Sequence, residues 1–560
     1  MNRNTQSHFS QVPRADIARS RFDRSSTVKT SFNVGQLIPF YVDEVLPGDT
    51  FSVDTSKVVR MQTMITPIMD NIYLDTYWFY VPSRILWDHW RELMGENRES
   101  AWIPKTEYSV PQVTSPSGGW EVGTIADYMG IPTGIADLSV NALPFRAYAE
   151  IVNEWFRDQN LQDPINISYG DATIAGSNGD DYLIDLVKGG QPFIAAKYHD
   201  YFTSCLPGPQ KGVDVELPVG SIPNLPVSVG DEHISSIASD DPHLRFVSSS
   251  FYAKTSPLVV QADNSGSTFT NGYLSSGTVS GQSVSLNGMP VVPSNLWAMS
   301  DGMSLTATTV NQLRLAFAIQ KFYERDARSG TRYVEILKSH FGVTAPDARL
   351  QRPEYLGGNR VPININQVVQ QSATVSGGTP QGTPVGLPQT ADSNSDFTKS
   401  FVEHGFIIGL MVARYDHTYQ QGLDRMWSRK TRFDYYFPVF ANIGEQPVLN
   451  KEIFAQGSAV DDEVFGYQEA WADYRYRPSR VTGQMRSQYA QSLDAWHLAD
   501  DYNNLPRLSS SWIQEDYHTV DRVLAVSSEL ANQLFADVYI KLNCVRPMPV
   551  FSVPGLIDHH

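Results

Sequence analysis

The stretch GTRYVEILKSHFGVTAPDARLQRPEYLGG, Gly330–Gly358, joins two predicted helices to a segment marked by proline and glycine. Upstream, apolar residues of Thr308–Asp326 recur at helical spacing, and Tyr333–Phe341 presents the apolar face of a second, shorter helix. Pro346 and the pair Gly357-Gly358 predict turns. The stretch carries no catalytic grouping. It therefore indicates a structural corner, and the rest of the chain is interpreted outward from it.

The composition favours a large β protein with long loops. The chain has 560 residues and a net charge of −17, which argues against a protein whose main role is to coat nucleic acid. Its two cysteines, Cys205 and Cys544, make no disulfide framework and suit a reducing compartment such as a bacterial cytoplasm. We expect neither a secretory signal nor membrane insertion, because no apolar run approaches about 18 residues.

Most predicted regular elements are strands. Residues rich in β-branched and aromatic side chains predict them, with Pro47-Gly48-Asp49 as one turn. The predicted strands are Val34–Leu46, Phe51–Met61, Asn71–Val81, Phe401–Tyr415, Phe433–Phe440, Arg522–Val526 and Phe535–Leu542. Ile85–Leu93 predicts a short helix, and Leu143–Asn160 predicts a longer one whose apolar stripe includes Tyr148, Ile151, Val152, Trp155 and Phe156.

The first 30 residues are basic in an acidic chain. Six basic residues stand against two acidic ones, a local excess of four positive charges. Two interpretations stay open, a flexible terminus and an arm that contacts phosphate.

Residues 213–303 change character, since serine, threonine, glycine and valine dominate there. Short alternating stretches between glycine and asparagine predict a hairpin-rich β insertion. It is either a passive surface loop or a functional one. Arg360–Ala391 is predicted to be another loop, because it is rich in proline and glycine.

Aromatic and arginine side chains alternate in Gly466–Gly483, GYQEAWADYRYRPSRVTG. Such side chains can stack on nucleic-acid bases, and they are also enriched in protein–protein contacts. The acidic chain favours the second interpretation. The subunit-contact candidates are Trp471, Tyr474, Arg475, Tyr476 and Arg477.

No motif for catalysis or cofactor binding is present. The chain lacks Gly-x-x-x-x-Gly-Lys-[Ser/Thr], Gly-x-Gly-x-x-Gly and His-Glu-x-x-His. Asp461-Asp462-Glu463 lacks the spacing of a calcium loop and indicates a solvated turn. We expect no catalytic, cofactor-binding or metal-ligating residue and no enzymatic activity; whether a divalent cation bridges subunits stays open.

Strands at both ends of the chain, separated by long excursions, favour an eight-stranded antiparallel jelly-roll barrel with a few helices in its insertions. The predicted segments are 1–30, a basic arm; 31–212, the first part of the barrel; 213–303, the insertion; and 304–560, the remainder with inter-subunit loops. A jelly-roll glycoside hydrolase or carbohydrate-binding protein is the alternative, because its paired carboxylates need not be close in sequence.

Several blocks resemble one known family. They are Asp75–Trp87 (DTYWFYVPSRILW), Ala196–Gly212 (AKYHDYFTSCLPGPQKG), Gly330–Gly358, Gly466–Gly483 and Met548–His560. Together they resemble the major capsid proteins of the Microviridae, small single-stranded DNA phages, and most closely the gokushovirus branch. The resemblance implies a viral-coat jelly roll, present as sixty copies in a T=1 icosahedral shell around a circular single-stranded DNA genome.

The resemblance also implies partners and contact residues. The arm would face the interior, with Arg14, Arg19, Arg21, Arg24 and Lys29 as DNA-contact candidates. The insertion would form a protrusion at the three-fold axes and meet a host surface receptor, with Asn271, Tyr273 and Asn287 as candidates. Implied partners are other copies of the chain, the packaged DNA, a small basic DNA-binding protein, an internal scaffolding protein and a pilot protein. The location would be the virion, assembled in the host cytoplasm.

Overall fold

The computed structural model describes residues 18–98, 105–213, 215, 310–329, 333–342, 351–372, 374 and 378–551, together with seven short strands between 227 and 298. The chain forms two compact units, one made of Met1–Lys211 with Glu324–His560 and the other of Gly212–Tyr323. The limits predicted for the 213–303 insertion stay a prediction, because most of its residues lie outside those described.

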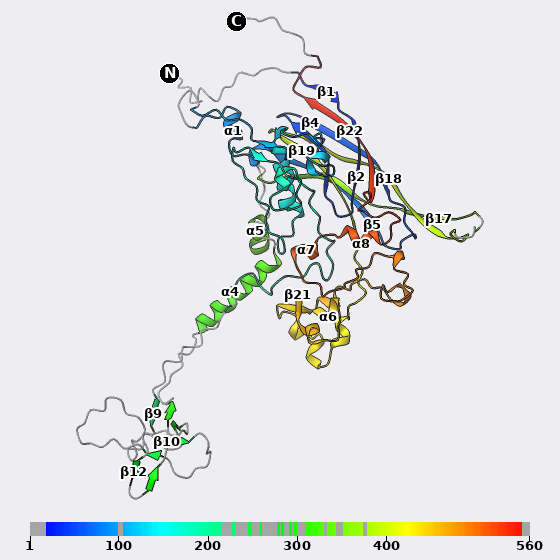
Figure 1. Ribbon diagram of the computed structural model, residues 1–560. Helices are drawn as coiled ribbons and strands as arrows, with labels where there is room; N and C mark the ends of the chain where they lie inside the picture. The colour runs from blue at the N-terminus through cyan, green and yellow to red at the C-terminus, as the bar shows by residue number, and fades with distance from the viewer. Residues whose placement is uncertain are drawn as a thin grey trace, which may run out of the picture. The chain divides into compact units, whose positions relative to one another are not determined.

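A six-stranded antiparallel sheet forms one layer of the first unit, and its long strands run side by side (Figure 1). Along β22 and β4 burial alternates residue by residue, so one face of this sheet packs inward and the other faces solvent. Its strands are β1 (Ser20–Asp23), β2 (Ser26–Phe32), β4 (Thr50–Met61), β17 (Ile365–Val369), β18 (Pro384–Ser400) and β22 (Leu534–Arg546).

A four-stranded antiparallel sheet forms the other layer, in the order β16-β5-β19-β3. Its strands are β3 (Ile38–Val45), β5 (Ile72–Pro82), β16 (Glu354–Pro362) and β19 (Gly405–Tyr415). Nearly every residue of β19 is buried, because both faces of this sheet are covered. Its continuous apolar run is therefore required, and an alternating pattern would bury polar groups.

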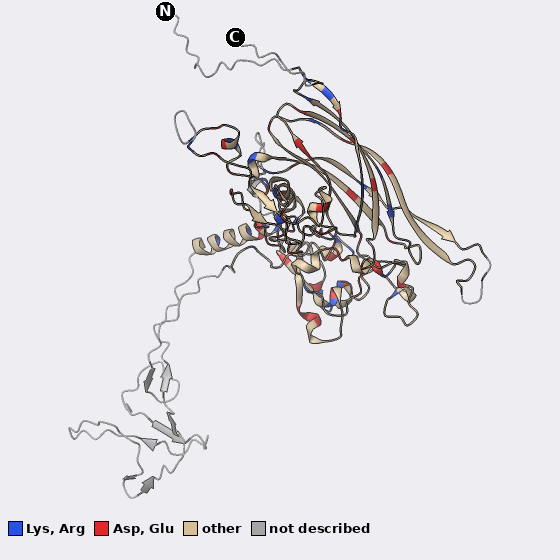
Figure 2. Ribbon diagram, turned by 45° about the horizontal axis from the view of Figure 1, so that its top comes forward, with Lys and Arg blue, Asp and Glu red and all other residues tan. Residues whose placement is uncertain are grey.

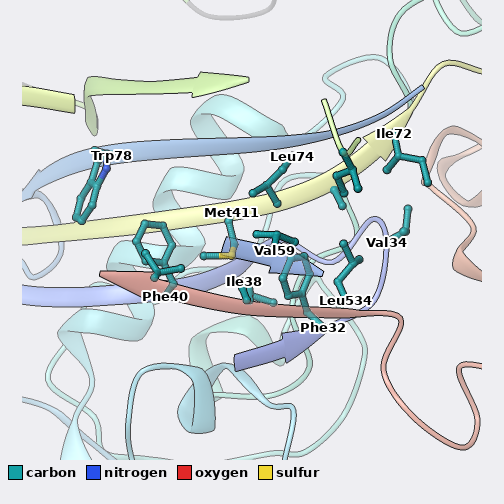
Figure 3. Close-up of a cluster of buried hydrophobic side chains, with 14 of the residues drawn as sticks. Phe32, Val34, Ile38, Phe40, Val59, Ile72, Leu74, Trp78, Met411 and Leu534 are labelled. Carbon is teal, nitrogen blue, oxygen red and sulfur yellow. The ribbon is translucent and has the colours of Figure 1, made fainter. Parts of the chain in front are cut away.

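The main core lies between the two sheets. Figure 3 shows side chains from both layers pointing toward one another, with Phe32, Val59 and Leu534 from one sheet and Trp78 and Met411 from the other. A second cluster covers the opposite face of the four-stranded sheet and centres on α3 (Leu143–Ile151). The fold class is thus mainly β, with antiparallel sheets and few helices, as the sequence predicted.

Shorter elements fill the connections. In the first unit they are α1 (Trp90–Leu93), β6 (Gln112–Thr114), α2 (Ile125–Tyr128), β7 (Ser139–Asn141), β8 (Ile174–Ala175), α5 (Tyr333–Phe341), β20 (Glu445–Leu449), α6 (Asn450–Ile453), β21 (Val464–Glu469), α7 (Ser510–Ile513) and α8 (Tyr517–Asp521). The second unit contains β9 (Val227–Val229), β10 (Arg245–Ser248), β11 (Leu258–Val259), β12 (Gly277–Val279), β13 (Gln282–Val284), β14 (Val291–Pro293) and β15 (Leu296–Ala298). The boundary between the units falls within α4 (Val310–Arg328).

Several sequence predictions of local structure are wrong. Phe433–Phe440 forms two 3₁₀ turns and no strand, since Pro438 begins the second turn. Arg522–Val526 also forms no strand. The helix predicted over Leu143–Asn160 leaves α-helical geometry after Ile151 and continues as a π-helical turn, in which Trp155 is 42% exposed. The loop predicted over 360–391 instead supplies the end of β16, all of β17 and the start of β18.

Gly357 and Gly358 lie inside β16, where a turn was predicted. They follow a β-bulge that shifts the pairing with β5 between Tyr355 and Gly357. Gly358 has a φ of 153°, and a Cβ there would overlap the backbone carbonyl oxygen of Thr76 on the neighbouring strand. The close approach of the two backbones therefore requires glycine.

Gly358→Ala should lower the free energy of unfolding by about 2–3 kcal/mol, because either β16 or β5 must shift to admit the methyl group. Thermal unfolding followed by tryptophan fluorescence measures the change. Gly170→Ala is the matched control, since its Cβ would meet only the Ser168 hydroxyl at 3.8 Å. Equal melting temperatures for the two variants would contradict the role given to Gly358.

Candidate functional site

An exposed surface of aromatic and basic side chains lies on two segments, 424–440 and 474–489, which we call the arginine–aromatic surface. Its first segment is a series of short 3₁₀ turns with few buried residues. The aromatic residues that are at least 45% exposed on it are Trp427, Phe433, Tyr435, Tyr436, Phe437, Tyr474, Tyr476 and Tyr489. Large apolar groups gathered in this way on one surface mark a contact with another molecule.

The buried side chain of Trp471 supports this surface. It is 6% exposed and has a φ of 64°, which is uncommon for a residue with a side chain. Its indole Nε1 donates to the carbonyl oxygen of Phe440 at 2.9 Å, and its backbone N–H donates to Gln446 Oε1 at 3.0 Å. Tyr436 packs edge-on against the indole ring at 5.7 Å. Trp471 thus holds the two segments together.

Arg429 connects the two segments by charge. Its guanidinium lies 4.4 Å from the ring centre of Tyr474 and 5.6 Å from that of Tyr435, and it also pairs with the Asp473 carboxylate. A cavity of about 190 Å³ opens beside it and is lined by Phe202, Asp424, Arg429, Tyr474 and Tyr476, among others. Stacked cation–π contacts of this kind keep the aromatic rings in fixed positions.

The arginine–aromatic surface is basic in an acidic chain. Its segments contain eight basic residues, Arg425, Arg429, Lys430, Arg432, Arg475, Arg477, Arg480 and Arg486, and two acidic residues, Asp424 and Asp434. Its net charge is therefore +6, whereas that of the whole chain is −17. A surface with this charge favours an acidic partner.

The structure divides the predicted subunit-contact residues into two groups. Tyr474 and Tyr476 are just over half exposed, and the Arg477 side chain is 71% exposed and 3.9 Å from Asp424. Arg475 pairs with Glu469 at the surface. Trp471, in contrast, is buried within its own chain and supports the others. Their contact with another subunit stays a prediction.

The described DNA-contact candidates lie at the edge of the six-stranded sheet. Residues from Ser20 onward form β1 and β2, which pair with β22, so this part of the predicted arm belongs to the sheet. Arg19 donates to the Gly48 carbonyl oxygen and Arg24 pairs with Asp43. Arg21 donates to Asn543 Oδ1 at 2.7 Å, and Lys29 is 3.6 Å from Asp537. Arg14 and the host-contact candidates Asn271, Tyr273 and Asn287 lie outside the described residues.

One buried charged cluster has no counterpart among the sequence predictions. The imidazole of His417, nearly inaccessible to solvent, bonds through Nδ1 to Asp500 Oδ1 at 2.9 Å and through Nε2 to Glu515 Oε2 at 3.1 Å. Lys197 Nζ lies 3.5 Å from Asp500, and the Tyr502 hydroxyl donates to the same carboxylate at 2.7 Å. The partners are far apart in sequence, so no local pattern could have revealed them.

This histidine cluster shifts two pKa values. Burial opposes the charged imidazole, but Asp500 and Glu515 outweigh that effect and raise the pKa of His417 to about 10. Burial also opposes the charged Asp500, yet Lys197 and His417 hold its pKa well below the usual range. The cluster therefore holds charges of both signs inside the protein at neutral pH.

Metal sites and membrane spans are both absent from the described residues. In that part of the chain, no group of three or more His, Cys, Asp and Glu residues has the arrangement of a metal site. Asp461 accepts hydrogen bonds from the backbone N–H groups of Gln456 and Gly457, as expected of a polar turn. Among the same residues, no helix has the length and apolar character to cross a bilayer.

A β scaffold that carries an open surface of aromatic and arginine side chains is typical of a structural protein that associates with other chains. Comparison with known proteins makes this specific. The chain belongs to the family described as Capsid protein (F protein), whose model matches residues 10–556.

Three relatives, each named Capsid protein VP1, match over nearly their full length. The protein of Spiroplasma virus 4 is 43% identical over 558 residues, which cover 98% of this chain and 97% of the relative. That of Chlamydia phage 1 is 43% identical over 592 residues, with coverages of 98% and 97%. That of Bdellovibrio phage phiMH2K is 42% identical over 560 residues, with coverages of 99% and 98%.

The family fixes the general role of the chain. It is a major capsid protein, a structural component of the virion that assembles into a shell. Membership in a structural family implies a role without catalysis. The comparisons do not support the alternative of a glycoside hydrolase or carbohydrate-binding protein.

Proposed function

We propose that the two large sheets are the halves of a jelly-roll barrel, sixty copies of which form a T=1 shell. The strand order carries this proposal. Of the eight long strands in chain order, the first, eighth, third and sixth (β2-β22-β4-β18) form one sheet. The second, seventh, fourth and fifth (β3-β19-β5-β16) form the other. This order supports the proposal, because a viral capsid jelly roll combines eight strands in two Greek keys.

The arginine–aromatic surface supplies contacts between copies. Tyr474, Tyr476 and Arg477 are exposed on it, and Trp471 fixes the turn that presents them. Tyrosine, tryptophan and arginine are the residues that dominate the binding energy of protein interfaces. The rest of the chain is acidic, so a neighbouring copy offers charge of the opposite sign.

The shell encloses circular single-stranded DNA. Sixty chains of charge −17 carry roughly −1,020 charges, so the shell as a whole cannot neutralise the genome. Cations and a small basic DNA-binding protein supply the missing positive charge. Arg14, Arg19, Arg21, Arg24 and Lys29 contribute locally.

Further partners act at other stages. An internal scaffolding protein assists closure of the shell, and a pilot protein accompanies the genome. The 213–303 insertion meets the host surface receptor, through residues such as Asn271, Tyr273 and Asn287. A divalent cation between subunits would be a further stabilising element.

Electron microscopy of negatively stained material from cells expressing the chain, alone and with the scaffolding protein, tests this function. The expected result is uniform icosahedral particles with protrusions at the three-fold positions. A chain that stays monomeric even with the scaffolding protein would overturn the proposed shell.

A further inference from the structure

The solvent-facing side of the six-stranded sheet is a broad surface without a cover among the described residues. Its central strands are β2, β22, β4 and β18. Alternate side chains of each strand point outward, and paired residues of neighbouring strands lie side by side on this face. Figure 2 shows both basic and acidic residues along these long strands, among a majority of uncharged ones. We call this surface the outer sheet face.

Many side chains on the outer sheet face are short and carry a hydroxyl group, so the face is polar and has few protruding groups. Ser56 and Ser393 hydrogen-bond across strands at 2.8 Å, and Thr398 donates to Ser52 at 2.9 Å. A hollow of about 620 Å³ lies over the centre of the face, and its lining residues include Thr27, Lys29, Ser56, Ser393 and Tyr539. Small side chains leave a flexible polymer room to approach the sheet closely.

Two aromatic rings rise from this polar surface. Phe535 is 42% and Tyr539 46% exposed, and both project from the outward side of β22. They are four residues apart on one strand, a separation of about 13 Å, so each can stack on a different base. Tyr539 is paired with Thr27 and Ser56 on the two flanking strands, which places hydroxyl donors beside the ring.

Basic residues flank the aromatic rings. Arg60 is paired with Phe535 in the sheet, and Lys29 and Lys541 lie on the same face, with Arg21 at its edge. The same face carries three acidic residues, Asp23, Asp54 and Asp537, so its net charge with these four basic residues is +1. The Lys29 side chain is 73% exposed despite its contact with Asp537, so it can still reach a phosphate.

We propose that the outer sheet face binds single-stranded nucleic acid, with Phe535 and Tyr539 stacking on bases and Lys29, Arg60 and Lys541 contacting phosphates. Exposed aromatic rings between basic groups are the combination by which proteins bind single strands without sequence preference. The charged residues counted on this face sum to one positive charge, whereas the whole chain has a net charge of −17. The face therefore does not repel phosphate as an acidic surface would.

This inference rests on the proposed packaging of single-stranded DNA and gives that DNA a location on the subunit. A second copy of the chain is the less suitable occupant. The face presents few large apolar groups apart from the two rings, whereas the interior of a stable protein interface is apolar.

The test measures binding of a fluorescent oligo(dT) of about 20 nucleotides to purified subunits by anisotropy over a salt series. Phe535→Ala with Tyr539→Ala should weaken binding at least about tenfold, because each stacked base contributes substantially. Lys29→Ala with Arg60→Ala should reduce the slope of log affinity against log salt by about 0.7 for each phosphate that the variant no longer neutralises.

Phe341→Ala is the matched control, because Phe341 is an exposed phenylalanine on α5, outside the sheet. It should bind the oligonucleotide as the unchanged chain does. Unchanged affinity for the oligonucleotide in the Phe535/Tyr539 variant overturns the inference. If that variant also fails to form shells, the two rings contact another protein subunit. Shells of the unchanged chain, observed by microscopy, test the proposed function separately.

Discussion

Asp500→Ala will lower the free energy of unfolding by about 3–5 kcal/mol at neutral pH, the largest effect expected of any single substitution described for this chain. The substitution leaves His417 and Lys197 buried with one carboxylate, Glu515, in place of two. A buried charge that loses its partner costs far more than a surface pair contributes. The melting temperature of purified subunits should fall by several degrees.

Asp501→Ala is the matched control for this substitution. Asp501 is the next residue along the chain, it is exposed, and its carboxylate accepts a bond from Gln421 Nε2 at 3.1 Å. Its removal should cost less than about 1 kcal/mol. Pairing Asp500→Asn with His417→Gln should restore part of the stability, since that pair of changes removes charges of both signs. Equal melting temperatures for the Asp500 and Asp501 variants would contradict the role given to the histidine cluster.

The same cluster predicts how stability varies with pH. His417 has a pKa raised from 6.5 to about 10, so its contribution is complete below pH 6.5 and is lost as pH rises toward 10. Asp500 has a lowered pKa, so its contribution is complete above its ordinary value of 3.8 and is lost as pH falls below it. His417→Gln should therefore flatten the decline of melting temperature on the alkaline side.

Elements with a strong local preference were predictable from the sequence. The strands predicted over Phe51–Met61 and Phe535–Leu542 match β4 and β22, where one face of the sheet is buried and the other is open. Tyr333–Phe341 matches α5 in both bounds. The failed predictions have two physical causes: contacts between residues distant in sequence, and aromatic residues that lie on a surface. Gly357-Gly358 was predicted as a turn, because the close passage of β5 that requires glycine is a tertiary contact.

Aromatic composition gave a wrong prediction at Phe433–Phe440. These residues have the composition of a strand, yet most are exposed, because they serve a surface and not a core. The alternating Gly466–Gly483 motif did indicate the arginine–aromatic surface, but not that Trp471 is buried beneath it. His417 could not be found at all, since its partners lie 83 and 98 residues further along the chain.

Trp427→Ala combined with Tyr476→Ala will prevent shell assembly at subunit concentrations that suffice for the unchanged chain. The two side chains are 68% and 52% exposed, so their removal leaves the fold almost unchanged. At an interface, a buried tryptophan or tyrosine contributes about 2 kcal/mol or more. A weakening of that size at each subunit raises the concentration required for assembly at least about tenfold. Sedimentation velocity of assembly mixtures measures it.

The control for this pair removes apolar groups of similar exposure elsewhere. Val402 and Leu530 are each more than 80% exposed and lie outside the arginine–aromatic surface. Val402→Ala with Leu530→Ala should assemble at the same concentration as the unchanged chain, and both double variants should keep its melting temperature. Assembly unaffected in the Trp427/Tyr476 variant would place the subunit contacts on another surface. Every contact between subunits recurs in all copies of a closed shell. Even a small loss of binding energy at one interface therefore distinguishes the assembly of the two double variants.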